Sequence, residues 1–268
     1  MTQDQKKQYL EFAKKTAKEA GEIMHQFYRS DHQVEVKADD SPVTIADKSI
    51  NSMLIQRVQE VFPDHGVLGE EESWQPDRDV VWVCDPIDGT AAFIQHIPLS
   101  MFSLACVYQG QPVVAVAYNP WSQDMYAATE GGGASRNDEP ISVSKRPWGE
   151  HTRLLGSSHG GISKEPADNV EIQKKLFHDK AHTTRLPGTV FKGCLIAEGS
   201  ADGRTFMHDG AHDIAALKLI IEEAGGKVTD LDGNEQRYDQ PINGAVMSNG
   251  LVHGELLKLV RQDENPRD

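Results

Sequence analysis

The chain has 268 residues, of which 27 are Lys or Arg and 41 are Asp or Glu, giving a formal net charge of −14. This length allows one large or two small domains with a hydrophobic core that needs no disulfide or metal to hold it. Its composition, 38% hydrophobic and 25% charged, is typical of a globular protein. Since binding to a nucleic-acid backbone requires clustered Lys and Arg, we expect no nucleic-acid partner.

The three cysteines, Cys84, Cys106 and Cys194, are odd in number, far apart and without a Cys-x-x-Cys pair. We expect them to be buried free thiols in a reducing compartment. The start of the chain has no apolar leader-like segment, and no apolar stretch approaches 18 residues. The sequence therefore predicts a cytoplasmic protein with no membrane association.

The first part of the chain shows a helical pattern followed by several strand-like runs. A second helix begins at Thr44 or Asp47 and ends near Phe62. The predicted elements are a helix at 4–29, a short strand at 34–37, this second helix, a buried strand at 80–83, and an antiparallel meander at 102–108, 113–118 and 125–129.

The second part alternates strands and helices. Its predicted elements are strands near 154–155, 183–186, 201–206 and 227–229, and helices near 168–178, 189–198 and 213–224. A polar stretch at about 144–152 separates the two parts. We expect one compact domain over 1–268 with approximate halves 1–145 and 150–268, and a layered α/β fold.

Acidic residues gather at the ends of predicted elements. Asp85 and Asp88 follow the buried strand, Glu70–Glu72 follow the apolar run 67–69, and Asp213 begins an apolar helix. Carboxylates at the mouth of a buried sheet cost desolvation energy unless a cation lies between them. Hard oxygen ligands of this kind suit Mg²⁺, which often shares its ligands with a phosphate.

The segment Asp85-Pro-Ile-Asp-Gly-Thr90 has a chemical logic of its own. Pro86 stiffens a turn that lets the two aspartates converge, and Gly89 lets the backbone approach a ligand closely. Gly89 and Thr90 would open the next element with N–H groups directed at an anion. The pattern favours a phosphoryl-transfer site, although two aspartates that only cap a turn remain the alternative.

With these residues the chain resembles the inositol monophosphatase superfamily of Mg²⁺-dependent, lithium-sensitive phosphatases, over about residues 8–260. The resemblance implies an αβαβα sandwich, with two sheets between helix layers, and a homodimer. The segments that carry it occur in the family's order: Ser41–Asp47, Gly69–Glu71, Asp85–Thr90, Asp213–Ala216 and Glu223–Gly226.

The resemblance also implies roles for individual residues. Two to three Mg²⁺ ions would be held by Glu70, Asp85, the carbonyl of Ile87, Asp88 and Asp213. Glu70 and Thr90 would orient a water for direct in-line attack on phosphorus, and Asp47 would orient Thr90 and assist a third, looser ion. Lys37 would support this acidic group from behind. The phosphate and substrate would contact Gly89, Thr90, Asp213, Gly188 and Thr189.

Two positions depart from the family pattern. His212 stands where Trp usually precedes the helix-starting aspartate, and Phe206 stands where inositol phosphatases have a Glu that binds substrate hydroxyls. An aromatic ring cannot accept those hydrogen bonds; it could stack on a base or an imidazole, or it could simply be a core residue, which is the commoner role of a lone Phe. The substrate is ranked as histidinol phosphate, then a 3′-phosphonucleotide, then an inositol or sugar phosphate. Segments 37–44 and 194–199 resemble the histidinol-phosphatase and bisphosphate-nucleotidase branches. Further pocket candidates are Arg185, Arg204, His208 and Asp209.

Two other interpretations stay open. A non-catalytic regulator that binds a phosphorylated metabolite or a metal could retain the same fold. His208 and His212 are four residues apart, a spacing that can bind zinc on a helix. Against zinc, Gly210 lies between them near a helix start and no third soft ligand is evident in the sequence.

Overall fold

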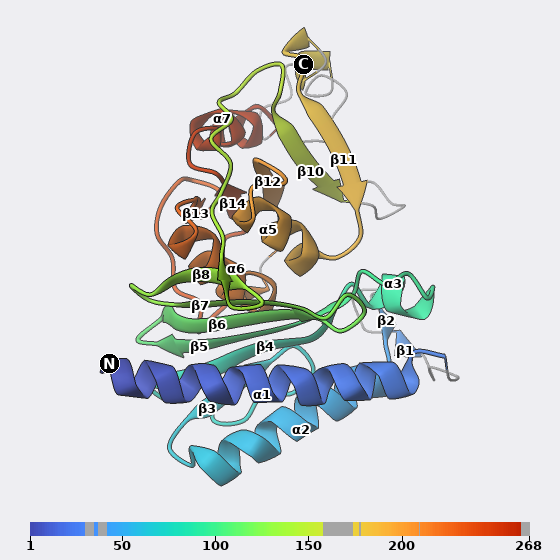
Figure 1. Cartoon of the computed structure of the whole chain (residues 1–268), viewed down its shortest axis with the longest axis vertical. Helices are drawn as coiled ribbons and strands as arrows, with labels where there is room; N and C mark the ends of the chain where they lie inside the picture. Colours follow the sequence, from blue (N-terminus) through green and yellow to red (C-terminus); the bar gives the residue numbers. More distant parts are fainter. Residues whose placement is uncertain (30–34, 37–41, 158–173, 177, 209, 264–268) are drawn as a thin grey trace.

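The structure, a computed structural model, describes residues 1–29, 35–36, 42–157, 174–176, 178–208 and 210–263. Its helices and sheets form five layers (Figure 1). Two helices cover one face of a seven-stranded sheet, two more helices lie between that sheet and a five-stranded sheet, and a last helix covers the far side. The predicted layered α/β fold is confirmed.

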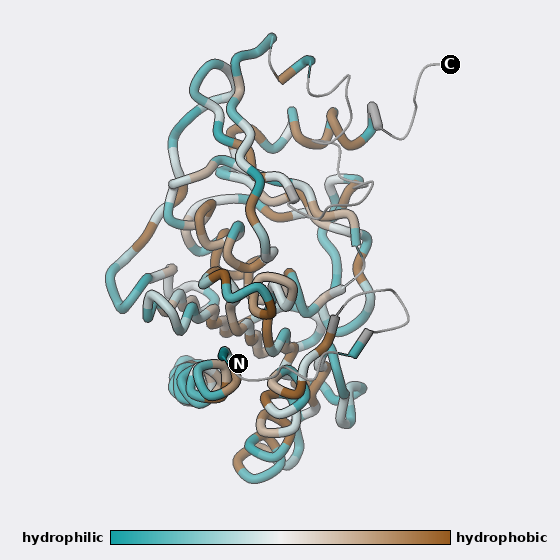
Figure 2. Tube along the Cα trace, turned by 90° about the vertical axis from the view of Figure 1, so that its right-hand side faces the viewer, coloured by the Kyte–Doolittle hydropathy of each residue, from teal (hydrophilic) through white to brown (hydrophobic). Residues whose placement is uncertain are grey.

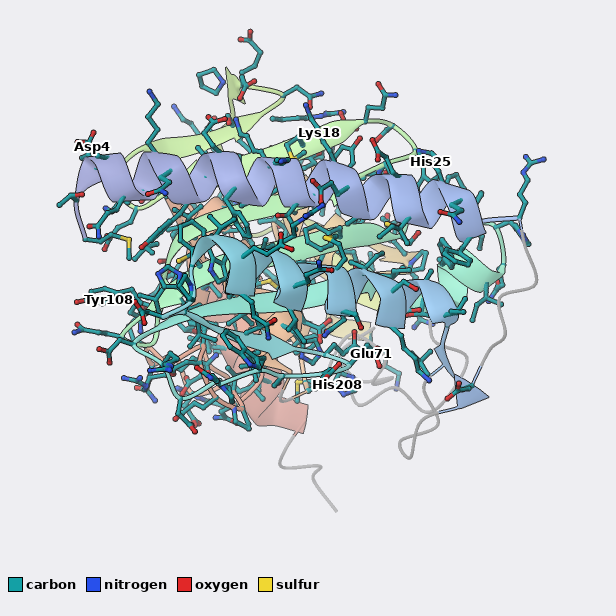
Figure 3. The ribbon with its side chains drawn as sticks, turned by 90° about the horizontal axis from the view of Figure 1, so that it is seen from below. Asp4, Lys18, His25, Glu71, Tyr108 and His208 are labelled. Atoms are coloured by element: carbon teal, nitrogen blue, oxygen red, sulfur yellow. The ribbon has the colours of Figure 1, made fainter. Side chains whose placement is uncertain are left out.

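The outer layer consists of α1 (Gln3–Phe27) and α2 (Ile45–Val61), which lie side by side across the seven-stranded sheet (Figure 3). Thr44 is the N-cap of α2, and its side chain and that of Asp47 form a reciprocal capping box. The helix therefore begins at Ile45. The alternative start at Asp47 was wrong because Asp47 is the third helical residue.

The seven-stranded sheet has the order β3-β4-β5-β6-β7-β8-β9, with β3 parallel to β4 and the remaining pairs antiparallel. The predicted meander is confirmed, while the short strands β3, β8 and β9 had not been predicted. The bounds are β3 (Gly66–Gly69), β4 (Val80–Asp88), β5 (Met101–Tyr108), β6 (Gln111–Asn119), β7 (Asp124–Thr129), β8 (Gly133–Arg136) and β9 (Glu139–Pro140).

Strand β4 runs further than the sequence predicts. It continues through Pro86 to Asp88, and its pairing with β5 shifts register between Asp85 and Asp88. The expected turn is thus an irregular strand end, because proline can be placed where a ladder hydrogen bond is interrupted. Three short elements complete this part of the chain: β1 (Glu35–Val36) pairs with β2 (Pro42–Val43), and α3 (Thr90–Ile94) contacts β2.

The five-stranded sheet has the order β11-β10-β12-β14-β13. Strand β10 pairs in parallel with β11 and β12, whereas β14 is antiparallel to β12 and β13. Strand β14 and helix α7 had not been predicted, and most of the helix predicted near 168–178 lies outside the described residues. The bounds are β10 (Arg153–Ser157), β11 (His182–Leu186), α5 (Thr189–Ala197), β12 (Gly203–Phe206), α6 (Ala211–Glu223), β13 (Lys227–Thr229), β14 (Ala245–Ser248) and α7 (His253–Asp263).

Three apolar clusters fill the spaces between the layers. One joins α1 and α2 to the large sheet, one surrounds α5 and α6 between the sheets, and a smaller one lies under α7. The hydrophobic segments, brown in Figure 2, run through these interior layers. All three cysteines are buried free thiols, as the sequence predicts. None of the helices in the described residues is both long and apolar enough to cross a membrane.

Candidate functional site

Three aspartates from two elements meet at one end of the large sheet. Asp85 and Asp88 come from the end of β4, and Asp213 is the third residue of α6. One carboxylate oxygen from each lies within 4.8 Å of the others. Asp85 and Asp88 are buried, whereas the side chain of Asp213 is 21% exposed. The cluster therefore has a buried floor and one accessible side.

The fold explains why these residues meet. The interior of β4 is apolar, so the strand crosses the core and delivers its acidic end to the edge of the apolar layer. Helix α6 packs on β4, β5 and β6, which brings its first turn to the same place. A carboxylate in the first turn of a helix is favoured by the helix dipole. Asp213 is thus positioned by its helix as well as by packing.

The cluster concentrates negative charge. Burial raises the pKa of Asp85 well above its usual range, and the charges of Glu70, Asp88 and Asp213 raise it further. Burial, followed by the charges of Asp88 and Glu70, likewise raises the pKa of Asp213. A cation bound between these carboxyl groups would offset their mutual repulsion and favour their ionised forms.

Asp88 links the large sheet to α5. Its two carboxylate oxygens accept hydrogen bonds from the backbone N–H groups of Thr189 (2.6 Å) and Val190 (2.8 Å). Gly188 has φ +72°, and a Cβ there would lie 2.6 Å from the Asp88 Oδ2. Gly188 and Thr189, which the resemblance gave as contacts of the substrate, are therefore placed at the site, where their observed contacts are to Asp88.

A further buried carboxylate, that of Asp47, lies behind Thr90. Asp47 Oδ2 accepts hydrogen bonds from the Thr44 backbone N–H (2.8 Å) and hydroxyl (2.5 Å). The hydroxyl of Thr90 lies 3.4 Å from Asp47 Oδ1 and donates to the Ile87 carbonyl at 3.1 Å. Burial raises the pKa of Asp47 to about 7, although the Thr44 hydrogen bonds oppose the shift. The structure thus brings Thr90 and Asp47 together.

Two buried polar atoms beside the cluster have no hydrogen-bond partner among the described residues. They are Asp85 Oδ1 and Ser103 Oγ. Ser103 is opposite Asp85 in the β4–β5 ladder, and both residues occupy the strand face that packs against α6, as Val83 and Ala105 do. Buried acceptor atoms nearly always have a hydrogen-bond partner or a bound ion. The unpartnered Asp85 carboxylate oxygen therefore suits a cation that prefers oxygen ligands, or a water molecule bound to such a cation.

Two buried cations lie near the cluster. Lys192, on α5, directs its Nζ at the Gly156 carbonyl (3.4 Å), and Arg204, on β12, donates from Nε to the Thr205 carbonyl (3.1 Å). Burial raises the pKa values of Asp88 and Asp213, and the positive charges of Lys192 and Arg204 partly offset that rise. Sequence reasoning missed Lys192, although a lysine inside the apolar run 189–197 was a visible signal.

The positions that depart from the family pattern are also near Asp213. Phe206 is buried, with its ring 5.9 Å from the Arg204 guanidinium carbon and 5.3 Å from the ring of His208. His212 Nε2 lies 3.5 Å from an oxygen of Asp213. Among the described residues, the three-residue group that could hold a metal contains aspartates and no histidine. The zinc alternative therefore has no structural support there.

The remaining candidates are spread around this centre. Glu70 and Glu71 are partly buried on the loop after β3, and Figure 3 labels Glu71 beside α2. Arg185 is exposed on β11, at the edge of the small sheet. Lys37 and Asp209 lie outside the described residues.

A layered α/β fold with clustered carboxylates beside glycine-containing helix starts is typical of hydrolases that act on phosphoric monoesters. The model of the inositol monophosphatase family matches residues 5–265, and the chain belongs to that family. The family and the enzyme class, a phosphoric monoester hydrolase, are thus confirmed, and membership of this family implies a small phosphorylated substrate.

Individual relatives cover most of the chain. It is 33% identical to an inositol-1-monophosphatase of Mesorhizobium japonicum over 239 residues, 88% of each chain. It is 31% identical to the Nus factor SuhB of Pasteurella multocida over 229 residues, 84% of this chain and 85% of the relative. An inositol monophosphatase structure from Thermotoga maritima superposes with a TM-score of 0.86 at 27% identity, covering 96% of this chain and 98% of that one.

Proposed function

We propose that the chain is a Mg²⁺-dependent phosphomonoesterase that hydrolyses a small phosphorylated metabolite by direct attack of water. The observation that carries this proposal is the cluster of Asp85, Asp88 and Asp213, whose oxygens lie within 4.8 Å of one another. The buried Asp85 Oδ1 without a hydrogen-bond partner in the described structure supports it. Family membership supplies the reaction class.

The residues that would hold the ions, two to three in number, are Glu70, Asp85, Asp88, Asp213 and the carbonyl of Ile87. Bound Mg²⁺ would neutralise the carboxylates, polarise the phosphate and favour ionisation of water. The two buried cations would limit charge repulsion before the ions bind, because they already oppose the raised pKa values of Asp88 and Asp213.

The chain's own groups would orient the attacking water. The Thr90 hydroxyl donates its proton to Ile87 O or to Asp47, so its oxygen is left to accept a hydrogen bond from water. Glu70, whose charge acts directly on Asp85, would accept the water's other proton. The backbone amides of Gly89 and Thr90 would bind the phosphate at the start of α3.

For the substrate we propose the order histidinol phosphate, a 3′-phosphonucleotide, then an inositol or sugar phosphate. The support is Phe206, which offers no hydrogen-bond acceptor at the position where a carboxylate would bind the hydroxyls of a polyol; its ring is 3% exposed and belongs to the core between the sheets. We also propose a cytoplasmic homodimer, which analytical ultracentrifugation and cell fractionation would test.

A second candidate function is a regulator that binds a phosphorylated metabolite or a metal without turning it over. The specific observation in its favour is the similarity to a relative named as a Nus factor. Under this alternative the protein would bind Mg²⁺ and phosphate esters but release no phosphate.

Phosphate release from a panel of these esters, measured with Mg²⁺ and with EDTA, separates the two candidates. We expect Mg²⁺-dependent release that falls by roughly 100-fold in Asp88→Asn, since a ligand and the α5 contact are both altered. Absence of release from every ester, or an unchanged rate in Asp88→Asn, would contradict the phosphatase proposal.

A further inference from the structure

Asn51 is a polar residue in a buried position of α2. Its side chain is 1% exposed, although its neighbours on the inner side of the helix, Ile50, Leu54 and Val58, are apolar core residues. It lies four residues after Asp47, so both side chains project from the same side of α2. This side faces the loop that carries Glu70.

The side chain of Asn51 holds that loop. Its Nδ2 donates a hydrogen bond of 2.9 Å to the carbonyl of Glu72. Gly69, at the end of β3, comes so close that a Cβ there would lie 2.1 Å from Asn51 Oδ1 and 2.5 Å from the Glu72 carbonyl oxygen. The Asn51 amide therefore occupies space that a side chain at position 69 would need.

The loop is fixed at its other side by β4. The Glu70 N–H donates to the Cys84 carbonyl at 3.1 Å, directly before Asp85. Glu70 and Glu71 thus lie between two anchors, one on the strand that carries Asp85 and one on the helix that carries Asp47. A change at either anchor alters where the Glu70 carboxylate lies relative to both aspartates.

The asparagine has a cost as well as a contact. Among the described residues, Asn51 Oδ1 has no hydrogen-bond partner, and a buried amide oxygen without one costs free energy. An apolar side chain would avoid that cost but would leave the Glu72 carbonyl without this donor. Asn51 thus provides the Nδ2 donor that holds the Glu72 carbonyl, while its own Oδ1 is left without a partner among the described residues.

We propose that Asn51 is a positioning residue for the metal site, which fixes the Glu70 loop on α2 and so sets the distance from Glu70 to Asp85 and Asp47. This inference rests on the proposed metal-dependent function. It concerns the apo protein directly, since a loop held in place before the ion arrives loses less freedom when the ion binds.

The test is calorimetric titration of the Mg²⁺-free protein with MgCl₂, together with amide hydrogen exchange over residues 69–73. In Asn51→Ala and in Asn51→Leu, whose side chain keeps the branching and the number of heavy atoms of asparagine, we expect about 10-fold weaker Mg²⁺ binding or more. We also expect faster exchange in the loop of both variants. Asn249→Ala is the matched control, because Asn249, in the second half of the chain, is likewise buried and donates to the Ser144 hydroxyl and the Arg146 carbonyl.

The control should lose thermal stability while its Mg²⁺ affinity and loop exchange stay at the wild-type values. Wild-type Mg²⁺ affinity in both Asn51 variants would overturn the inference, as would an equal loss of affinity in Asn249→Ala. A wild-type protein that binds no Mg²⁺ would instead contradict the proposed function. The two failures are therefore distinguishable.

Discussion

At the scale of single residues, the clustered carboxylates of the site destabilise the ion-free protein. Burial and three neighbouring carboxylates hold the pKa of Asp85 well above its usual range, which means that folding disfavours its ionised form. For a group whose folded pKa is raised, folding stability is lost as the pH rises above the unfolded value. At neutral pH the ion-free cluster is consequently a source of strain that a bound cation removes.

The expected consequence is tested by Asp85→Asn. In EDTA at pH 7.5 this variant should melt several degrees above the wild type, because one unit of the repelling charge is gone; a chain of this size gains about 2–4 °C per kcal/mol. In MgCl₂ the wild type should gain stability and the variant should gain little. Thermal denaturation in both buffers checks this, and an ion-free variant less stable than the wild type would contradict it.

At the scale of elements, the contact between β4 and α5 depends on one glycine. Asp88 caps the first turn of α5, and the left-handed φ of Gly188 lets the chain pass beside that carboxylate. A Cβ at this position would both strain the backbone and push on Asp88.

Gly188→Ala should therefore reduce both the stability and the activity of the protein. We expect a destabilisation of about 1–2 kcal/mol from the backbone strain and a loss of Mg²⁺-dependent phosphate release from displacement of Asp88. Gly131→Ala is a matched control, because Gly131 has φ +73° and its added Cβ would have nothing within 4 Å. The two variants should share the stability loss in urea denaturation, and only Gly188→Ala should lose activity. Equal activities would argue that Gly188 does not position Asp88.

How far the sequence predicts these elements depends on how locally they are determined. The meander, α1 and α2 follow from hydrophobic periodicity and from caps such as Thr44, all of which are local signals. Strand β14 was missed because the four-residue strand Ala245–Ser248 is too short for a clear pattern. Helix α7 was missed although Leu256, Leu259 and Val260, which are buried, have helical spacing. The identity of β14 as a strand comes from pairing with β12 and β13, and α7 is held by the same sheet.

The same distinction applies to the site. The aspartates could be found because they sit at the ends of elements in a recognisable order. Other parts of the site depend on contacts between separate elements. Examples are the Asp88–Thr189 hydrogen bond, the contact of Lys192 with Gly156 and the hydrogen bond from Asn51 to Glu72. No spacing along the chain encodes such contacts, so the structure was needed to show them.

At the scale of the whole molecule, the outer layer formed by α7 depends on a neutral histidine. His253 is buried at the start of α7, with Nδ1 2.9 Å from the Ser248 hydroxyl and Nε2 3.0 Å from the Thr229 hydroxyl. Burial, followed by the charges of Lys227 and Lys218, lowers the pKa of His253 to about 4 from an unfolded value of 6.5. The smallest core cluster lies under this helix.

This shift predicts a loss of stability in mild acid. Above pH 6.5 the histidine is neutral in both states; between 6.5 and 4 only the unfolded state binds the proton, so stability falls by about 3 kcal/mol in total and then levels off. Urea denaturation in EDTA at pH 7.5 and 4.5 measures this. His253→Gln should lose less stability than the wild type across this interval, and an identical loss in both proteins would exclude His253 as the source.

The three buried cysteines offer a way to watch the layers separately. Cys84 and Cys106 belong to the core beneath α1 and α2, while Cys194 belongs to the core between the sheets. Burial raises the pKa of all three thiols, so the folded protein keeps them both protonated and inaccessible to alkylating reagents. Reaction at each thiol therefore requires local opening of its own core. The chain carries built-in chemical reporters that would show which layer separates first when the protein is warmed or stripped of ions.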